Sequence, residues 1–155
     1  MGKQARVTSI EVLREARAAL QVFETNTRAA LSEVDADVQR TTDWLRMQQL
    51  PHWQKQIRER SEALAQARSD LLRKQLSSMQ DSPSCVDEQR AVSRAKQRLE
   101  SAQQRLQVVR RWITVWEREA TLYKGQTQAL SDTLARDIPA AVQRLDRMGR
   151  ALAGY

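Results

Sequence analysis

The chain has 155 residues, of which 29% are charged and 41% hydrophobic, and 26 basic against 19 acidic side chains give it a net charge of +7. With 4 Gly, 3 Pro and 1 Phe, the composition favours long helices over sheets or disorder. The single cysteine excludes an internal disulfide and agrees with a reducing compartment. No stretch reaches the roughly 18 uncharged apolar residues of a membrane span, and residues 1–9 contain no apolar signal core. We therefore expect a cytoplasmic protein.

The first predicted helix begins near Thr8, because Thr8 and Glu11 have the spacing of a capping box. Apolar residues recur along it at helical spacing, with Thr27 and Thr41 as interruptions. The predicted apolar face consists of Leu13, Ala16, Leu20, Phe23, Ala30, Val34, Val38 and Leu45.

Pro51 either begins a new helix or kinks a continuing one. The flanking residues 47–50 and 52–54 include no Gly, Asn, Asp or Ser that would favour a chain reversal. We therefore predict a kink at Pro51, followed by a second apolar stripe that ends at Met79. The competing interpretation is an elongated three- or four-helix bundle in which the chain reverses at Pro51.

Residues 80–84 carry the strongest loop signal of the chain, and Ser84 with Asp87 can cap the helix that follows. That helix has ten apolar positions at alternating steps of three and four, the spacing of a seam that packs against another helix. Pro139 predicts a second kink, after which the apolar stripe continues. The ten positions are Val92, Ala95, Leu99, Ala102, Leu106, Val109, Ile113, Trp116, Ala120 and Tyr123.

Two arms of similar length, residues 8–79 and 85–153, predict one all-α domain over residues 1–155. Its fold would be a long antiparallel helical hairpin, or coiled coil, with a tip loop at residues 80–84. A tip near residue 83 would place residue i beside a residue close to about 166 minus i. Because this register gathers the tryptophans in one zone, we expect a core aromatic cluster of Trp44, Trp53, Trp112, Trp116 and Tyr123.

The positive charge is concentrated near the predicted tip, with +2 in residues 51–81 and +4 in residues 82–124. Such a surface suits an acidic protein or the phosphates of nucleic acid. The plainer interpretation is a solvated face that keeps a coiled coil soluble. No base-reading motif accompanies the charge. The predicted partner-binding residues are Arg58, Arg68, Lys74, Arg90, Arg94, Arg98 and Arg105.

Reactive chemistry has few candidates in this sequence. Cys85 is a candidate reactive thiol, because it lies at the start of a predicted helix whose dipole favours a thiolate. One His and one Cys cannot supply the usual ligands of a metal site, and the glycines form no phosphate-binding loop. We therefore predict no catalytic, cofactor or metal site, no small-molecule substrate, and no enzyme.

The predicted function is that of a non-enzymatic coiled-coil scaffold or adaptor that acts by protein–protein interaction within a complex. Its basic, tip-proximal half would contact an acidic partner, while the neutral base self-associates or docks. The alternative is a nucleic-acid-binding protein without sequence preference, similar in role to nucleoid-associated proteins. Membrane association is disfavoured, because no basic helix combines its charge with a large exposed apolar face.

Overall fold

The computed structural model describes residues 2–77 and 84–154, with side chains from residue 8 onward. The described residues contain no strand, and nearly all of them are helical. The elements are α1 (Gly2–Asp43), η1 (Trp44–Gln49), α2 (Leu50–Ser77), α3 (Val86–Asp132), η2 (Thr133–Asp137) and α4 (Ile138–Ala153). The prediction of an all-α fold is confirmed.

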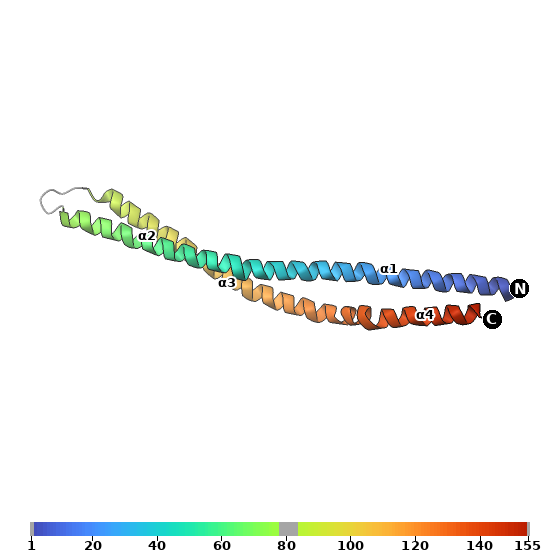
Figure 1. Ribbon diagram of the computed structural model, residues 1–155. Helices are drawn as coiled ribbons and strands as arrows, with labels where there is room; N and C mark the ends of the chain where they lie inside the picture. The colour runs from blue at the N-terminus through green and yellow to red at the C-terminus, as the bar shows by residue number, and fades with distance from the viewer. Residues whose placement is uncertain (1, 78–83, 155) are drawn as a thin grey trace. The chain divides into compact units, whose positions relative to one another are not determined.

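The chain divides into two compact units, and each contains segments from both halves of the sequence. The terminal unit consists of Met1–Gln39 and Glu119–Tyr155, and the central unit consists of Arg40–Arg118. In the terminal unit α1 lies beside α4, and in the central unit α2 lies beside the first part of α3 (Figure 1). In both units the paired segments run antiparallel, so the predicted helical hairpin is confirmed.

Two predicted helix starts differ from the structure. α1 begins at Gly2, so Thr8 lies within the helix and the predicted capping box does not mark its beginning. α3 begins at Val86, and the Gln89 N–H donates to the Cys85 carbonyl oxygen at 3.0 Å. Cys85, and not Ser84, therefore caps this helix through its carbonyl. Met79 and most of the predicted tip loop, residues 80–83, lie outside the described residues.

The seam predicted for the second arm is present. All ten positions from Val92 to Tyr123 are buried or half-buried, and Ala102, Leu106 and Val109 are the most enclosed of them. The residues between them are mostly exposed, as expected for a helix that packs through one narrow stripe.

The first arm has a seam at the same alternating spacing, but its residues differ from the predicted ones. Half-buried or buried positions at steps of three and four run from Ile10 to Leu45, with a gap at the exposed Val34. They include Thr27 and Thr41, which belong to the seam instead of interrupting it. Helical geometry fixes which positions face the partner helix, and polar side chains occupy several of them. Four of the predicted apolar-face residues are exposed: Ala16, Phe23, Ala30 and Val34.

Pro51 and Pro139 are each preceded by a π-helical turn, and the chain does not reverse at either one. In η1 the Leu50 N–H donates to the Leu45 carbonyl five residues earlier, directly before Pro51. In η2 the Ile138 N–H donates in the same way to the Thr133 carbonyl, directly before Pro139. Proline has no N–H and its ring clashes with the carbonyl four residues earlier, so a wider turn accommodates it within the helix. The bundle in which Pro51 reverses the chain is excluded.

Each π-helical turn also inserts one residue into the seam. Continuing the spacing beyond Leu45 would bury positions 48, 52, 55 and 59, yet all four are exposed, whereas 49, 53, 56 and 60 are half-buried. Beyond Leu134 the seam moves in the same way, to positions 138, 142, 145, 149 and 152. A π-helical turn holds more residues than an α-helical turn. The buried stripe therefore continues to face the other arm, although its positions in the sequence are shifted by one residue.

The register of the two arms differs slightly from the predicted one. Arg17 Nη1 lies 3.0 Å from Asp146 Oδ1 in the terminal unit, and Arg46 Nε donates to Glu117 Oε1 at 2.6 Å in the central unit. These pairs place residue i beside a residue close to 163 minus i, not 166. The reason is that the helix ends next to the tip are centred near residue 81 instead of residue 83.

The predicted core aromatic cluster is wrong for two of its members. Trp44 is 47% exposed and Trp112 is 58% exposed, because both lie beside the seam and not in it. Trp53, Trp116 and Tyr123 are half-buried seam residues. Trp116 Nε1 donates to Thr42 Oγ1 at 3.0 Å, which joins the two arms of the central unit. Burial, with the Asp35 carboxylate as a second cause, raises the pKa of the Tyr123 hydroxyl.

The core is small. Seven of the described side chains are buried, and all are hydrophobic: Leu45, Leu64, Ala102, Leu106, Val109, Leu134 and Ile138.

Candidate interaction surfaces

The net charge belongs to one of the two units. The central unit has 16 basic and 9 acidic side chains, a net charge of +7, whereas the terminal unit has 10 of each and is neutral. Most of the charged side chains in both units are exposed, so the charge difference lies mainly on their outer surfaces. This division agrees with the predicted basic tip-proximal half.

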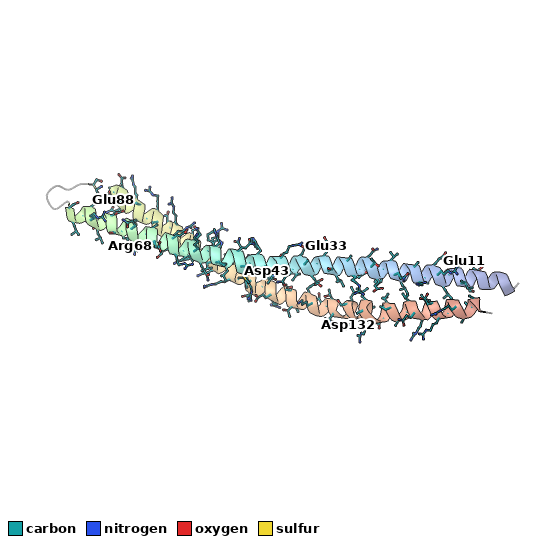
Figure 2. All side chains as sticks on the ribbon, viewed as in Figure 1. Glu11, Glu33, Asp43, Arg68, Glu88 and Asp132 are labelled. Carbon is teal, nitrogen blue, oxygen red and sulfur yellow. The ribbon has the colours of Figure 1, made fainter. Side chains whose placement is uncertain are left out.

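All seven predicted partner-binding residues lie in the central unit. Figure 2 shows one of them, Arg68, on α2 and labels Glu88 at the beginning of α3. Six of the seven are exposed, and Lys74 is half-buried.

Lys74 already has a partner within the chain. Its Nζ lies 2.5 Å from Glu88 Oε1, which joins the end of α2 to the beginning of α3. The hydrogen bond from Lys74 lowers the pKa of Glu88, and the hydrogen bond to Glu88 raises the pKa of Lys74. Arg90 is also engaged, more loosely, with Nη1 3.8 Å from Asp87 Oδ1. Of these two contacts only the one made by Lys74 links the two helices, because Arg90 and Asp87 both belong to α3.

Three of the remaining five arginines lie on one side of α3. Arg94, Arg98 and Arg105 are spaced four and seven residues apart, are exposed, and form no ion pair within the described part of the chain. Arg98 follows Ala91 by two helical turns. Ala91 shares a surface hollow with Ala63 and Asp70 of α2. The three arginines therefore lie on the edge of the helix pair that contains this hollow, the edge marked by Ala63 and Asp70 on α2.

Arg58 and Arg68 lie on the other edge of α2. Ala63 comes one residue before buried Leu64, whereas Arg68 comes one residue after half-buried Ala67. Because successive residues of a helix are rotated by about 100°, Ala63 and Arg68 lie on opposite sides of the seam. The seven predicted residues therefore do not form one patch.

Exposed apolar side chains continue the arginine row along α3. Val108, Trp112 and Val115 are all exposed, and the spacing of positions 94, 98, 101, 105, 108, 112 and 115 alternates between three and four. This second stripe runs beside the seam and could have been found in the sequence by testing each helix for more than one periodic face. The name α3 outer face is used below for Arg94, Arg98, Arg105, Val108, Trp112 and Val115.

Cys85 and His52 do not come together as a reactive pair. Cys85 is half-buried at the beginning of α3, where its carbonyl accepts the first hydrogen bond of the helix. His52 packs edge-on against Trp53, with ring centroids 5.1 Å apart. His52 is itself exposed near the beginning of α2.

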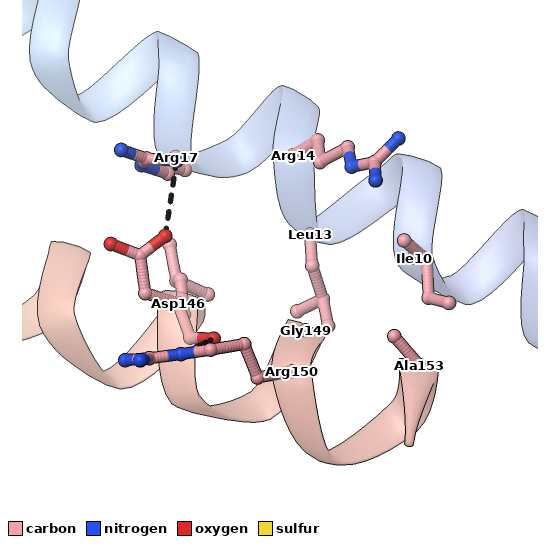
Figure 3. A pocket seen from close by; sticks show the side chains of 9 residues that line it. Ile10, Leu13, Arg14, Arg17, Asp146, Gly149, Arg150 and Ala153 are labelled. Carbon is pink, nitrogen blue, oxygen red and sulfur yellow. Dashed lines mark hydrogen bonds and ion pairs between the residues drawn. The ribbon is translucent and has the colours of Figure 1, made fainter. Parts of the chain in front are cut away.

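A small hollow of about 220 Å³ lies between α1 and α4 in the terminal unit. Figure 3 shows Leu13 directed toward Gly149, while the guanidinium groups of Arg14 and Arg150 point in opposite directions. Arg17 is held by its ion pair with Asp146. Because the arginines do not converge, the hollow provides no common point for an anion.

A larger groove of about 850 Å³ lies in the terminal unit, again between α1 and α4. Two large apolar side chains border it, Phe23 at 47% exposure and Met148 at 52%. The name α4 groove is used for this surface. Its other lining residues are Ala16, Ala19, Leu20, Asp137, Ala140, Ala141, Arg144 and Leu145.

In comparisons with known proteins, no family model matches the chain, and no curated protein or solved structure is similar enough to count as a relative. Within the described helices, none is long and apolar enough to cross a lipid bilayer. Across residues 2–77 and 84–154, no group of three His, Cys, Asp or Glu side chains is arranged to hold a metal ion.

Proposed function

We propose that this protein is a non-enzymatic helical scaffold or adaptor whose central unit binds an acidic amphipathic helix of a partner protein. One observation carries the proposal. On the α3 outer face, unpaired arginines lead directly into exposed Val108, Trp112 and Val115. The surface thus combines positive charge with apolar area along one line.

This combination suits a helix better than other acidic ligands. A partner helix with apolar residues at steps of three and four would continue the packing geometry of the seam. Acidic residues on the same helix would lie opposite Arg94, Arg98 and Arg105, which provides orientation and speeds association. Trp112 supplies the kind of large, flat side chain that dominates binding energy at protein interfaces.

Nucleic acid remains the second candidate, supported by the net charge of +7 on the central unit. Duplex DNA would contact arginines on any edge, including Arg58 and Arg68, and would gain little from Val108 or Val115. The two candidates therefore depend on different side chains.

The test uses two defined probes and the full chain. One probe is a synthetic helical peptide with Glu and Leu at alternating steps of three and four, and the other is a DNA duplex of arbitrary sequence. Reversing the charge in the triple variant Arg94→Glu, Arg98→Glu, Arg105→Glu should weaken peptide binding by at least about tenfold, measured by fluorescence anisotropy. Trp112→Ala should cost about 2 kcal/mol of peptide binding.

Matched controls separate position from total charge. The variant Arg58→Glu, Arg68→Glu, Arg110→Glu makes the same change in net charge on other sides of the central unit and should leave peptide binding nearly intact. Equal losses in both triple variants would contradict the proposal. DNA binding that both triple variants reduce and Trp112→Ala leaves unchanged, with a steep dependence on salt, would favour the nucleic-acid candidate.

A further inference from the structure

We infer that the α4 groove is the self-association surface of this chain, where a second copy packs antiparallel about a two-fold axis that passes between Ala140 and Ala141. This surface lies in the terminal unit and does not depend on what binds the α3 outer face. The inference rests on the stripes of α4, the placement of two charges, and the area that one copy leaves exposed.

The π-helical turn η2 gives α4 two adjacent stripes. The residue inserted there moves the seam to positions 138, 142, 145, 149 and 152, where Ile138 is buried and the rest are half-buried. The stripe that would have continued the earlier seam, positions 137, 141, 144 and 148, turns toward the groove. It keeps the alternating spacing of a helix-packing surface, yet within the chain it is only partly covered.

The charges on this second stripe are self-complementary. Asp137 and Arg144 both line the groove and are exposed, and neither forms an ion pair within the described residues. Seven residues separate them, about 10.5 Å along the helix, which is too far for them to pair with each other. In an antiparallel contact about a two-fold axis, Asp137 of each copy meets Arg144 of the other, as an isologous interface requires.

The apolar residues fit the same axis. Ala140 and Ala141 lie midway between the two charges, and their small side chains allow two helices to approach closely. In the register of the terminal unit Phe23 lies across from a position close to residue 140. The exposed ring is thus beside the axis, where it would pack against the second copy. Met148 closes the stripe on its other side.

The exposed area favours a second copy over a solvated groove. One copy exposes 12,085 Å², whereas a compact monomer of this mass exposes about 8,000 Å². A stable protein interface removes roughly 1,600 Å² in total. Because only seven side chains of the helix pair are buried, enough surface stays exposed to form such an interface. The α4 groove is a concave part of that surface and is lined mainly by apolar side chains.

The test measures the mass of the full chain by sedimentation equilibrium across micromolar concentrations. The unaltered chain should be a dimer. Asp137→Arg places two cations opposite each other at both ends of the contact, and Arg144→Asp places two carboxylates there, so each should weaken the dimer by roughly tenfold or more. The double variant Asp137→Arg, Arg144→Asp should recover the dimer, and so should an equal mixture of the two single variants.

The control is Arg147→Asp, which changes an exposed arginine of α4 that does not line the groove. It should leave the dimer unchanged, and far-UV circular dichroism should show equal helix content in every variant. As a second readout, Ala140→Cys in a Cys85→Ser background should cross-link to its symmetry mate with a short bismaleimide, whereas Arg147→Cys should not. A monomeric unaltered chain, or charge reversals without effect on mass, would overturn the inference.

Discussion

The central and terminal units use the same antiparallel seam but present different outer surfaces. The central unit carries the whole net charge of +7, with unpaired arginines and an exposed Trp112 on α3. The terminal unit is neutral and has an apolar groove flanked by Asp137 and Arg144. Residues that build the helix pair and residues that select its partners are thus separable, because a seam uses only two of every seven positions.

The comparison also shows how each unit tolerates a proline. Pro51 in the central unit and Pro139 in the terminal unit each follow a π-helical turn, and both turns insert one residue into the seam. In the terminal unit the insertion turns a second stripe of α4 toward the groove, so an interruption of the helix determines which residues are presented outward. The sequence predicts a kink at each of these prolines, and the structure shows that the seam positions also shift by one residue there.

The largest effect should come from shifting the seam where no π-helical turn can absorb the change. Deleting Gln103, an exposed residue of α3, rotates Leu106 and Val109 away from the first arm by about 100°. We expect loss of cooperative unfolding of the central unit, measured by thermal melting followed by circular dichroism.

The matched deletion is in η2. Removing Ala135 together with Pro139→Ala eliminates the inserted residue and the proline that the wide turn accommodates. The seam then continues at its regular spacing, so we expect helix content and the melting temperature to stay close to those of the unaltered chain. An equally severe loss in this variant would show that η2 does more than correct the phase.

A smaller effect is expected from one buried leucine. Leu134→Ala removes a side chain that is 2% exposed in the terminal unit, which should lower the free energy of unfolding by about 3 kcal/mol. Leu130→Ala, at 36% exposure near the end of α3, should cost less than about 1 kcal/mol.

Tryptophan fluorescence can assign this loss to a unit. All four tryptophans, Trp44, Trp53, Trp112 and Trp116, belong to the central unit. In Leu134→Ala the urea midpoint from circular dichroism should therefore fall more than the midpoint from fluorescence. Identical shifts by both probes would mean that the two units unfold as one.

The smallest effect concerns acid. The hydrogen bond from Lys74 lowers the pKa of Glu88 below its ordinary value of 4.5. The stabilisation is therefore present above that value and is lost as the pH falls through the lowered native pKa. Amide hydrogen exchange in the first turn of α3, corrected for intrinsic rates, should be faster at low pH. Glu88→Gln should remove this pH dependence, whereas Glu100→Gln, whose partner Lys96 is 3.9 Å away, should not.

The candidate surfaces were only partly predictable from the sequence. The concentration of basic residues was readable, and so were the arginines at 94, 98 and 105. The grouping of these three apart from Arg58 and Arg68 was not, because it depends on which edge of each helix flanks the seam. The engagement of Lys74 by Glu88 depends on the register across the tip, which places the end of α2 beside the beginning of α3.

The sequence by itself determined the helical class, the pairing of the two halves and the ten seam positions from Val92 to Tyr123, because alternating steps of three and four are a local property of a helix with one apolar stripe. The tertiary structure alone decided the phase beyond Leu45 and Leu134, the exposure of Trp44 and Trp112, and the turning of Asp137 and Arg144 into the α4 groove. These features depend on how a π-helical turn rotates everything that follows it. One extra residue in a turn is a small local change. Its effect on which residues are buried becomes visible only when the position of the opposite helix is known.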